Sequence, residues 1–405
     1  MSRRINHAYP FLFAIIPVLR LVAAYPGWAE LADAAVMLTT VIAACGVVYG
    51  LALLGTRRSG SGLAALIMMA VVLGFWVYPR MAMLLDRRAG LSHPILLPFC
   101  AGATLGVIWC LARRPALLNG VESFLTVTSG VLVTWFVLSI GVNEWRSAGA
   151  LRRSALVHRL AAPIPVQPRA RVGPKRDIYL IVLDEYANAE VTGSLFQFDN
   201  HVFLDSLRRL GFVVPAVHSN YLHTFLSLPS LLNAAHVAGL SGEIGSRSVD
   251  RTVPDYLVQH NRTARFLKSQ GYEFAFFPSR SWEATRHNSE ANVEFDAWHG
   301  SNPWRGALHS GLAQVLIKTS LLRYVDLGER PDIRAHVTRT FAAVAQSPKI
   351  PGPVFALAHV VSPHDPYVFD RDCRPATWKP GRGSRLELTK VPYVEQVQCL
   401  NHMRG

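Results

Sequence analysis

The chain has 405 residues, a formal net charge of +14 and a hydrophobic fraction of 50%. Its mean hydropathy is positive, at +0.22. These values are too apolar for a single soluble domain of this size. The apolar excess lies in the first 145 residues, as expected for a membrane region.

Residues 1–144 are predicted to form a transmembrane region of about five helices. Each apolar stretch except the first is about long enough to cross a bilayer, and the first is interrupted by Arg20 and bent by Pro17. No stretch resembles a cleavable signal peptide, because the apolar stretches follow one another as spans. The predicted spans are residues 9–25, 31–55, 61–84, 94–112 and 121–142.

Five crossings would place the two ends of the chain on opposite sides of the membrane. The pairs Arg3-Arg4, Arg57-Arg58 and Arg113-Arg114 would then share one face, which the positive-inside rule makes cytoplasmic. We therefore expect a multi-pass protein of the cytoplasmic (inner) membrane, with its C-terminal domain on the outer, periplasmic side. Arg80, Arg87 and Arg88 count against this arrangement, and four or six spans with a cytoplasmic domain remain the alternative.

Residues 145–176 are predicted to form a basic linker. Its middle is stiffened by three prolines, and it contains no acidic residue. Such a segment beside a membrane attracts anionic lipid headgroups, although a solvated linker explains it equally well. Nucleic acid is not expected as a partner, because the aromatic and groove-reading elements of a binding module are missing. The basic residues are Arg146, Arg152, Arg153, Arg159, Arg169, Arg171, Lys175 and Arg176.

Residues 177–405 are predicted to form an α/β domain with a mainly parallel sheet and helices on both faces. Residues 178–183 are an unbroken apolar run, typical of a strand buried on both faces, and they end at Asp184-Glu185. A helix over 203–210 stops at Gly211, and residues 212–214 begin a second strand. Thr224 then opens another helix.

The later elements continue the same alternation. We expect helices over 263–270, 334–345 and 393–401, and strands over 272–277 and 354–361. Residues 283–330 are only weakly periodic and carry no assignment. The last predicted strand contains His359 and runs into a loop with His364.

Asp184 and Thr224 are the first candidates for chemistry. Ligands of open α/β sheets bind at the carboxyl edge, where both residues are expected. A carboxylate there can hold a divalent metal, and a threonine at a helix N-terminus can act as a nucleophile. The alternative is that Asp184 caps a turn and Thr224 is only an N-cap.

The segment resembles the start of the catalytic domain in the alkaline phosphatase superfamily. It is most similar to the membrane-anchored sulfatase-like branch of lipoteichoic acid synthases and phosphoethanolamine transferases, in which a strand ends in a metal-binding acid and the nucleophile lies in a Thr-x-x-Ser-x-Pro stretch. Asp184 matches the first feature and Thr224 to Pro229 the second. The true sulfatase signature fits less well, because Leu231 stands where an arginine is expected. Ser227 is the reserve nucleophile.

A second feature of that branch is a strand followed by a Ser-His-Gly-Pro-like loop, whose histidine approaches the substrate phosphate. His364 followed by Asp365-Pro366-Tyr367 matches it, with Asp in place of Gly. His364 could hydrogen-bond a phosphate oxygen or protonate a leaving group. His359 lies inside the strand and is interpreted as a packed residue or one that supports the site.

The resemblance implies an enzyme that cleaves or transfers a phosphate or sulfate ester of an envelope lipid or glycan. Asp184 would bind a divalent metal, Zn²⁺ or Mn²⁺ with Ca²⁺ and Mg²⁺ as alternatives. Glu185 and Thr224 are further candidate ligands, Thr224 is the nucleophile and His364 is the other catalytic residue.

The family continues to a strand ending in Asp-His-Gly, which supplies further metal ligands and which this sequence does not reach. We therefore expect an incomplete catalytic domain. The alternative is a catalytically inactive, truncated envelope protein that binds membrane lipid. Cys373 and Cys399 lie in the domain expected outside the cytoplasm, which leaves a disulfide between them open.

Overall fold

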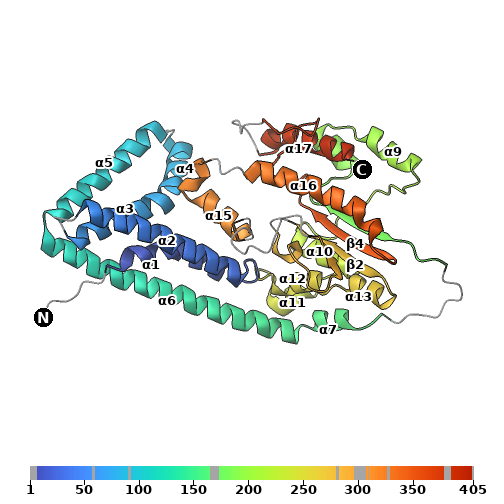
Figure 1. Cartoon of the computed structure of the whole chain (residues 1–405), viewed down its shortest axis with the longest axis horizontal. Coiled ribbons are helices and arrows are strands. Elements are labelled where there is room, and N and C mark those ends of the chain that lie inside the picture. Colours follow the sequence, from blue (N-terminus) through green and yellow to red (C-terminus); the bar gives the residue numbers. More distant parts are fainter. Residues whose placement is uncertain are drawn as a thin grey trace. The chain divides into compact units, whose positions relative to one another are not determined.

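The computed structural model shows two compact units (Figure 1). It describes residues 7–56, 60–89, 93–164, 173–279, 282–295, 307–308, 310–325, 329–377 and 385–403. The first unit, here called the helical unit, comprises Met1–Arg152, Val249–Thr252 and Ser301–Leu327. The second, here called the α/β unit, comprises Arg153–Ser248, Val253–Gly300 and Gly328–Gly405. Two segments that the sequence assigned to the C-terminal domain therefore belong to the helical unit.

The helical unit is built from long apolar helices. Val18 on the first helix and Met37 on the second pack against Leu312 and Leu316 of a short helix from the later segment. This shared apolar core explains why residues 301–327 fold with the N-terminal helices. The helices are α1 (Tyr9–Ala24), α2 (Leu31–Gly55), α3 (Ser61–Trp76), α4 (Tyr78–Ala89), α5 (His93–Ala112), α6 (Pro115–Arg153) and α15 (Gly311–Thr319), followed by the 3₁₀ turn η2 (Leu321–Tyr324).

The prediction of about five spans needs correction. Among the described residues, three helical stretches are long and apolar enough to cross a membrane: Leu31–Gly55, Ile95–Ala112 and Leu117–Arg153. Ser61–Trp76 and Tyr78–Leu85 pass that test only as a pair, bent by 46°. Helix α1 has 16 residues, so it is about 24 Å long against a hydrocarbon core of about 30 Å. The described residues therefore contain three candidate membrane spans, or four if the bent pair is one span.

Among its described residues, the α/β unit contains a four-stranded parallel sheet in the order β1-β4-β2-β3. The strands are β1 (Ile178–Leu183), β2 (Glu273–Phe277), β3 (Val293–Glu294) and β4 (Val354–Val360). In the register of β1 and β4, Val182 lies opposite His359. The predicted parallel sheet is therefore confirmed, and its carboxyl edge carries the residues that follow β1 and β4.

Helices cover both faces of the sheet, as predicted. Phe274 and Phe355 face one core with α10 and α13, whereas Phe277 and Ala356 face another with α16. The alternation follows from the period of two along a strand. The helices of this unit are α7 (Ala155–Ala161), α8 (Ala189–Phe196), α9 (His201–Arg209), α10 (Thr224–Leu232), α11 (Leu240–Ile244), α12 (Thr252–Gln259), α13 (Arg262–Ser269), α16 (Glu329–Gln346) and α17 (Arg385–His402), with 3₁₀ turns η1 (Glu283–Thr285) and η3 (Ser347–Lys349).

One predicted strand does not form, and the burial predicted for another is wrong. Residues 212–219 have no regular secondary structure, and Phe212 and Val213 are exposed. The run 178–183 does form β1, but Tyr179 and Ile181 are exposed because β1 is an edge strand of the described sheet. The strand buried along its whole length is β4, which pairs with β1 on one side and β2 on the other.

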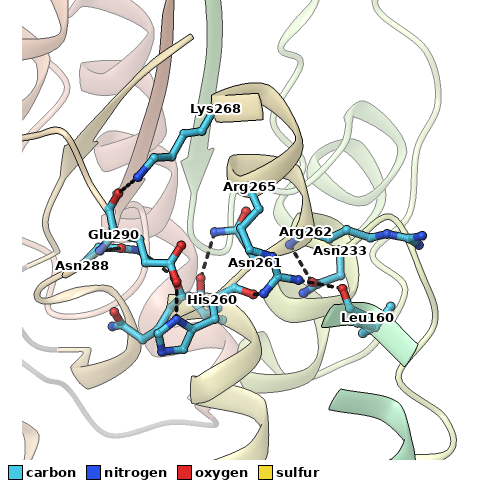
Figure 2. Close-up of polar contacts among 11 residues, drawn as sticks. Leu160, Asn233, His260, Asn261, Arg262, Arg265, Lys268, Asn288 and Glu290 are labelled. Carbon is cyan, nitrogen blue, oxygen red and sulfur yellow. Dashed lines mark hydrogen bonds and ion pairs between the residues drawn. The ribbon is translucent and has the colours of Figure 1, made fainter. Parts of the chain in front are cut away.

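The first part of the predicted linker is folded. Residues 145–153 continue α6, and α7 packs Leu156, Val157 and Leu160 into the α/β unit. Figure 2 shows Arg265 of α13 reaching toward the end of α7, where its guanidinium donates to Leu160 O at 2.7 Å and to His260 O at 2.9 Å. At the other end of α7, Glu243 accepts from Leu156 N at 2.9 Å. An acid at its N-terminus and a base at its C-terminus both favour a helix.

Candidate functional site

Asp184 and Thr224 are in direct contact at the carboxyl edge of the sheet. Asp184 is the first residue after β1, and its backbone N donates to Val360 O at the end of β4 at 2.9 Å. Thr224 is the first residue of α10, and its Oγ1 donates to Asp184 Oδ1 at 3.1 Å. The carboxylate is 9% exposed, so the hydroxyl replaces water as one of its partners.

His364 and Glu185 complete the cluster. The backbone N of His364 donates to Asp184 O at 3.1 Å, which ties the loop after β4 to the turn after β1. The Nε2 atom of His364 lies 3.4 Å from Glu185 Oε1. Glu185 has a φ of 64°, an uncommon left-handed conformation for a residue with a side chain. The turn directs this carboxylate toward His364.

His364 carries more positive charge than an ordinary histidine. Burial by itself lowers its pKa, but Nδ1 donates to Asp365 O at 2.6 Å, and Glu185, Asp365 and Asp184 add negative charge nearby. The net result is a pKa raised above its ordinary value. The side chain is 37% exposed, so its Nε2–H can reach a ligand from solvent.

His359 is buried beside this cluster. Thr285 Oγ1 donates to Ser279 Oγ at 2.8 Å, so its oxygen accepts from His359 Nδ1 at 2.8 Å. Within the described part of the chain, Nε2 of His359 has no hydrogen-bond partner. Burial lowers the pKa of His359 to about 4, so the imidazole is neutral at pH 7 and its Nε2 is an acceptor. The prediction that His359 is packed holds, and the free acceptor adds a feature that the sequence did not indicate.

Two residues of α17 hold the loops of the site in place. Tyr393 OH donates to Glu185 O at 2.9 Å and accepts from Ala187 N at 3.1 Å. Gln396 Nε2 donates to Pro363 O at 3.1 Å and to His364 O at 3.3 Å. Sequence reasoning found the helix but missed these two roles, because no pattern relates a helix to loops about 30 and 200 residues away.

The cluster contains all four predicted site residues: Asp184, Glu185, Thr224 and His364. The expected position of Asp184 and Thr224 at one sheet edge is therefore confirmed, whereas the chemical roles of all four residues stay predictions. Ser227 lies one turn further along α10, and the contact with Asp184 is made by Thr224. This geometry favours Thr224 over Ser227 as the nucleophile.

The donor set does not fit a metal ion as it stands. Across the described residues, no group of three or more His, Cys, Asp or Glu side chains could hold one. Asp184 and Thr224 supply two oxygens, and Glu185 is directed toward His364. Zinc sites have three or four protein ligands, so any divalent ion held by these residues alone is bound weakly.

Comparison with known proteins gives no further assignment: no family model, no curated protein and no solved structure matches the chain. The function is therefore inferred from the arrangement of residues at the sheet edge. There the Thr224 hydroxyl, at the first turn of α10, is hydrogen-bonded to the Asp184 carboxylate. The His364 imidazole, with its raised pKa, belongs to the same cluster.

Proposed function

We propose that the α/β unit is the catalytic part of a membrane-anchored enzyme that cleaves or transfers a phosphate or sulfate ester. The observation that carries this proposal is the hydrogen bond of 3.1 Å from Thr224 Oγ1 to Asp184 Oδ1 at the carboxyl edge of a parallel sheet. A nucleophile within hydrogen-bond reach of a base is the arrangement that covalent catalysis requires. The resemblance to the sulfatase-like branch of the alkaline phosphatase superfamily points to the same residues.

In the proposed first step, Thr224 Oγ1 forms a bond to the phosphorus or sulfur atom while Asp184 accepts the hydroxyl proton. The bond to the leaving oxygen breaks, and His364 Nε2 gives that oxygen a proton. The dipole at the N-terminus of α10 favours the anionic group beside Thr224. In the second step, water or an acceptor hydroxyl attacks the phosphorus or sulfur atom and gives its proton to His364 Nε2. The bond to Thr224 Oγ1 breaks and Asp184 returns the proton to that oxygen, which completes hydrolysis or transfer.

No step is assigned to a metal. The resemblance implies a divalent ion at Asp184, Glu185 and Thr224, but the described donor set is too small for tight binding. Asp184 accepting the threonine proton in concert with attack has a parallel in kinases, where a catalytic aspartate accepts a hydroxyl proton. Because that step needs only the residues in contact here, added metal is expected to change turnover modestly.

We also propose that the α/β unit lies outside the cytoplasm, with an envelope lipid or glycan as the substrate. If the bent pair α3–α4 is one span, Arg57-Arg58 and Arg113-Arg114 face the same side, and the chain after α6 emerges on the other side. The positive-inside rule makes the arginine side cytoplasmic. The α/β unit lies on the same side whether the chain has four spans or five. A fifth span at α1 would precede both arginine pairs and change only the side of the N-terminus.

The incomplete donor set also favours a second candidate: a catalytically inactive membrane protein that binds lipid. Arg152, Arg153 and Arg159 are exposed where the chain leaves the membrane candidate α6. Basic residues at such a position attract anionic headgroups by about 1 kcal/mol each. This candidate needs no chemistry at Thr224.

The test uses the full chain in lipid nanodiscs with bis(p-nitrophenyl) phosphate or p-nitrophenyl sulfate, with EDTA or added Zn²⁺ or Mn²⁺. We expect turnover of one substrate that falls at least 100-fold in Thr224→Ala, partly survives in Thr224→Ser and is unchanged in Ser227→Ala. Turnover that survives in Thr224→Ala overturns the assignment of the nucleophile. A folded wild-type chain with no turnover of either ester in any condition supports the lipid-binding candidate instead.

A further inference from the structure

One edge of the described sheet in the α/β unit is unprotected. Among the described residues, β1 pairs with β4 alone and ends the sheet on that side. Its six residues, IYLIVL, include no charged side chain and no proline. The strand at the other edge of the described sheet, β3, has only two residues. Natural proteins keep exposed edge strands short or charged, which prevents pairing with another chain, and β1 lacks both features.

The side chains on one face of β1 are also uncovered. Leu180 and Val182 pack against the core that includes residues of α10 and α13. Tyr179 and Ile181, which the period of two places on the opposite face, are each 41% exposed. A pair formed by an aromatic and a β-branched side chain across two strands stabilises a sheet. The exposed face of β1 therefore offers both members of such a pair.

The hydrogen bonds to β4 show which backbone groups of β1 point to the open side. Asp184 N donates to Val360 O at 2.9 Å, so Asp184 directs its N–H toward β4. The direction of the N–H and C=O groups alternates from one residue to the next along a strand. Tyr179 and Ile181 therefore direct theirs away from β4, where no strand lies among the described residues.

The residues at the two ends of β1 carry opposite charges. Lys175 and Arg176 precede the strand, and Asp184 and Glu185 follow it. An antiparallel strand of the same sequence would place the basic end of one copy beside the acidic end of the other, whereas a parallel strand would place like charges together. Opposite charges across a strand pair are favourable and like charges are not. The edge is therefore complementary to itself, as the interface of a two-fold dimer requires.

We propose that two copies of this chain pair through β1 as antiparallel strands, which joins their sheets into one continuous sheet. The outward backbone groups of Tyr179 and Ile181 then form hydrogen bonds to the second copy. Because those groups belong to odd-numbered residues, the two-fold axis passes through a residue position and not between two residues. The axis at Leu180 or at Ile181 gives the longest overlap of the two strands.

The charges distinguish these two registers. With the axis at Leu180, Tyr179 lies opposite Ile181 of the second copy, and Arg176 lies opposite its Asp184. With the axis at Ile181, Asp177 lies opposite Glu185 of the second copy, which is an unfavourable pair of like charges. The register centred on Leu180 is therefore the one that we expect.

The interface formed by β1 is small. An edge of six residues buries less than the roughly 1,200 Å² at which specific, stable interfaces begin. Weak pairing suffices for chains that are confined to one membrane, because confinement raises their effective concentration. The described residues contain three helices long and apolar enough to cross a membrane, and these provide the confinement. The test is therefore made in membranes, and the proposal does not depend on the proposed enzyme activity.

Disulfide cross-linking of the full chain in membranes tests both the pairing and its register. Each variant carries one new cysteine at a position from 178 to 183, with the three free cysteines Cys45, Cys100 and Cys110 replaced by serine. A disulfide needs Cα atoms within about 7 Å. A residue on the two-fold axis is about 5 Å from its own copy, and the next residue along is about 8 Å from its copy.

We expect Leu180→Cys to give at least 5-fold more cross-linked dimer than any other variant of this series. A maximum at Ile181→Cys overturns the register. Equal yields at all six positions, or no dimer at any of them, overturn the pairing.

A second experiment avoids the partly buried Leu180 and uses the two exposed positions. Tyr179→Cys and Ile181→Cys chains with different tags, made together, should cross-link to each other and not to themselves. Adding Arg176→Glu to both chains should lower this yield about 5-fold, because it places like charges together. Arg209→Glu, at an exposed arginine of α9, is the matched control and should leave the yield unchanged. A yield that Arg176→Glu does not change, or equal linking of either variant to itself, overturns the proposal.

Discussion

The two units each place a carboxylate beside hydroxyl groups and a histidine, but they treat these groups differently. In the α/β unit, Asp184 accepts from Thr224 at 3.1 Å, and His364 is 37% exposed. In the helical unit, Glu122 and Tyr9 are buried, and Glu122 Oε1 lies 3.4 Å from His7 Nδ1. The first cluster is open to solvent at His364, whereas the second is closed to solvent at Glu122 and Tyr9.

This difference separates two kinds of cluster. A hydroxyl held on a carboxylate within reach of solvent can exchange protons with a substrate that arrives and leaves. A carboxylate buried beside an imidazole instead stabilises the fold, because loss of either group leaves the other buried without its partner. We therefore expect substitutions in the α/β cluster to change turnover, and substitutions in the helical cluster to change stability.

The largest expected effect is that of Asp184→Asn on turnover. An amide cannot take the proton from Thr224, so turnover of the ester in nanodiscs should fall about 10³-fold, within the range for loss of general-base catalysis. The unfolding temperature should change little, because the amide oxygen still accepts the hydroxyl hydrogen bond. If Glu122→Gln reduces turnover as strongly as Asp184→Asn, the distinction between the two clusters is wrong.

The next effect concerns the disulfide between Cys373 and Cys399, which the structure forms in the α/β unit. These cysteines are 26 residues apart, and closing such a loop stabilises a fold by about 3.5 kcal/mol in the chain-entropy estimate. Cys399→Ser should lower the unfolding temperature of the α/β unit, as measured by calorimetry, and reduction of the wild type should have the same effect. Cys45→Ser in the helical unit is the control. An unchanged transition after reduction would contradict the prediction.

Much of this fold could be predicted from local patterns. The apolar run before Asp184 correctly predicted the first strand, and Gly211 correctly predicted the end of α9. Gly211 has a φ of 89°. The residues of the candidate site could be placed because parallel strands bring their carboxyl ends to one edge. The edge position of β1 could not be predicted, since neighbours in a sheet are set by pairing and not by the composition of one strand.

Other features depend on contacts between distant residues. Residues 301–327 fold with α1 and α2 because of an apolar core that joins Val18 to Leu312, and no local pattern reveals that pairing. The bend after Trp76 reduced the number of clear spans although composition favoured a continuous one. The cluster of Glu122, Tyr9 and His7 was also missed, because Glu122 and Tyr9 come from different helices and each residue looks ordinary in its own segment.

A third effect comes from pH and is confined to the α/β unit. His359 has a pKa of about 4 in the folded chain and about 6.5 when unfolded, so the unfolded chain binds the extra proton between these values. Its neutral form contributes about 3 kcal/mol of stability above pH 6.5, which is lost as the pH falls toward 4. Thermal unfolding at pH 7 and pH 5 should show this loss in the wild type and less of it in His359→Gln. The exposed His201→Gln is the control. An equal loss in all three proteins would assign the acid sensitivity to other groups.

The smallest effect concerns α7, through which the chain enters the α/β unit. Arg265 donates to Leu160 O and His260 O, and Arg265→Met keeps the apolar stem but removes both bonds. The expected cost is about 1 to 2 kcal/mol, because each hydrogen bond of this kind contributes about 1 kcal/mol. Hydrogen exchange of residues 155–161 should become roughly 10-fold faster, since 1.4 kcal/mol corresponds to a factor of ten in the opening equilibrium.

Arg262→Met is the matched control for that experiment. Arg262 lies on the same helix, and its side chain extends away from α13 and is not joined to Leu160 in Figure 2. Its replacement should leave exchange in α7 unchanged. If Arg265→Met also leaves exchange unchanged, the buried side chains Leu156, Val157 and Leu160 hold α7 by themselves. Helix α7 would then be held mainly by apolar packing, as α1 and α2 are held against α15 in the helical unit.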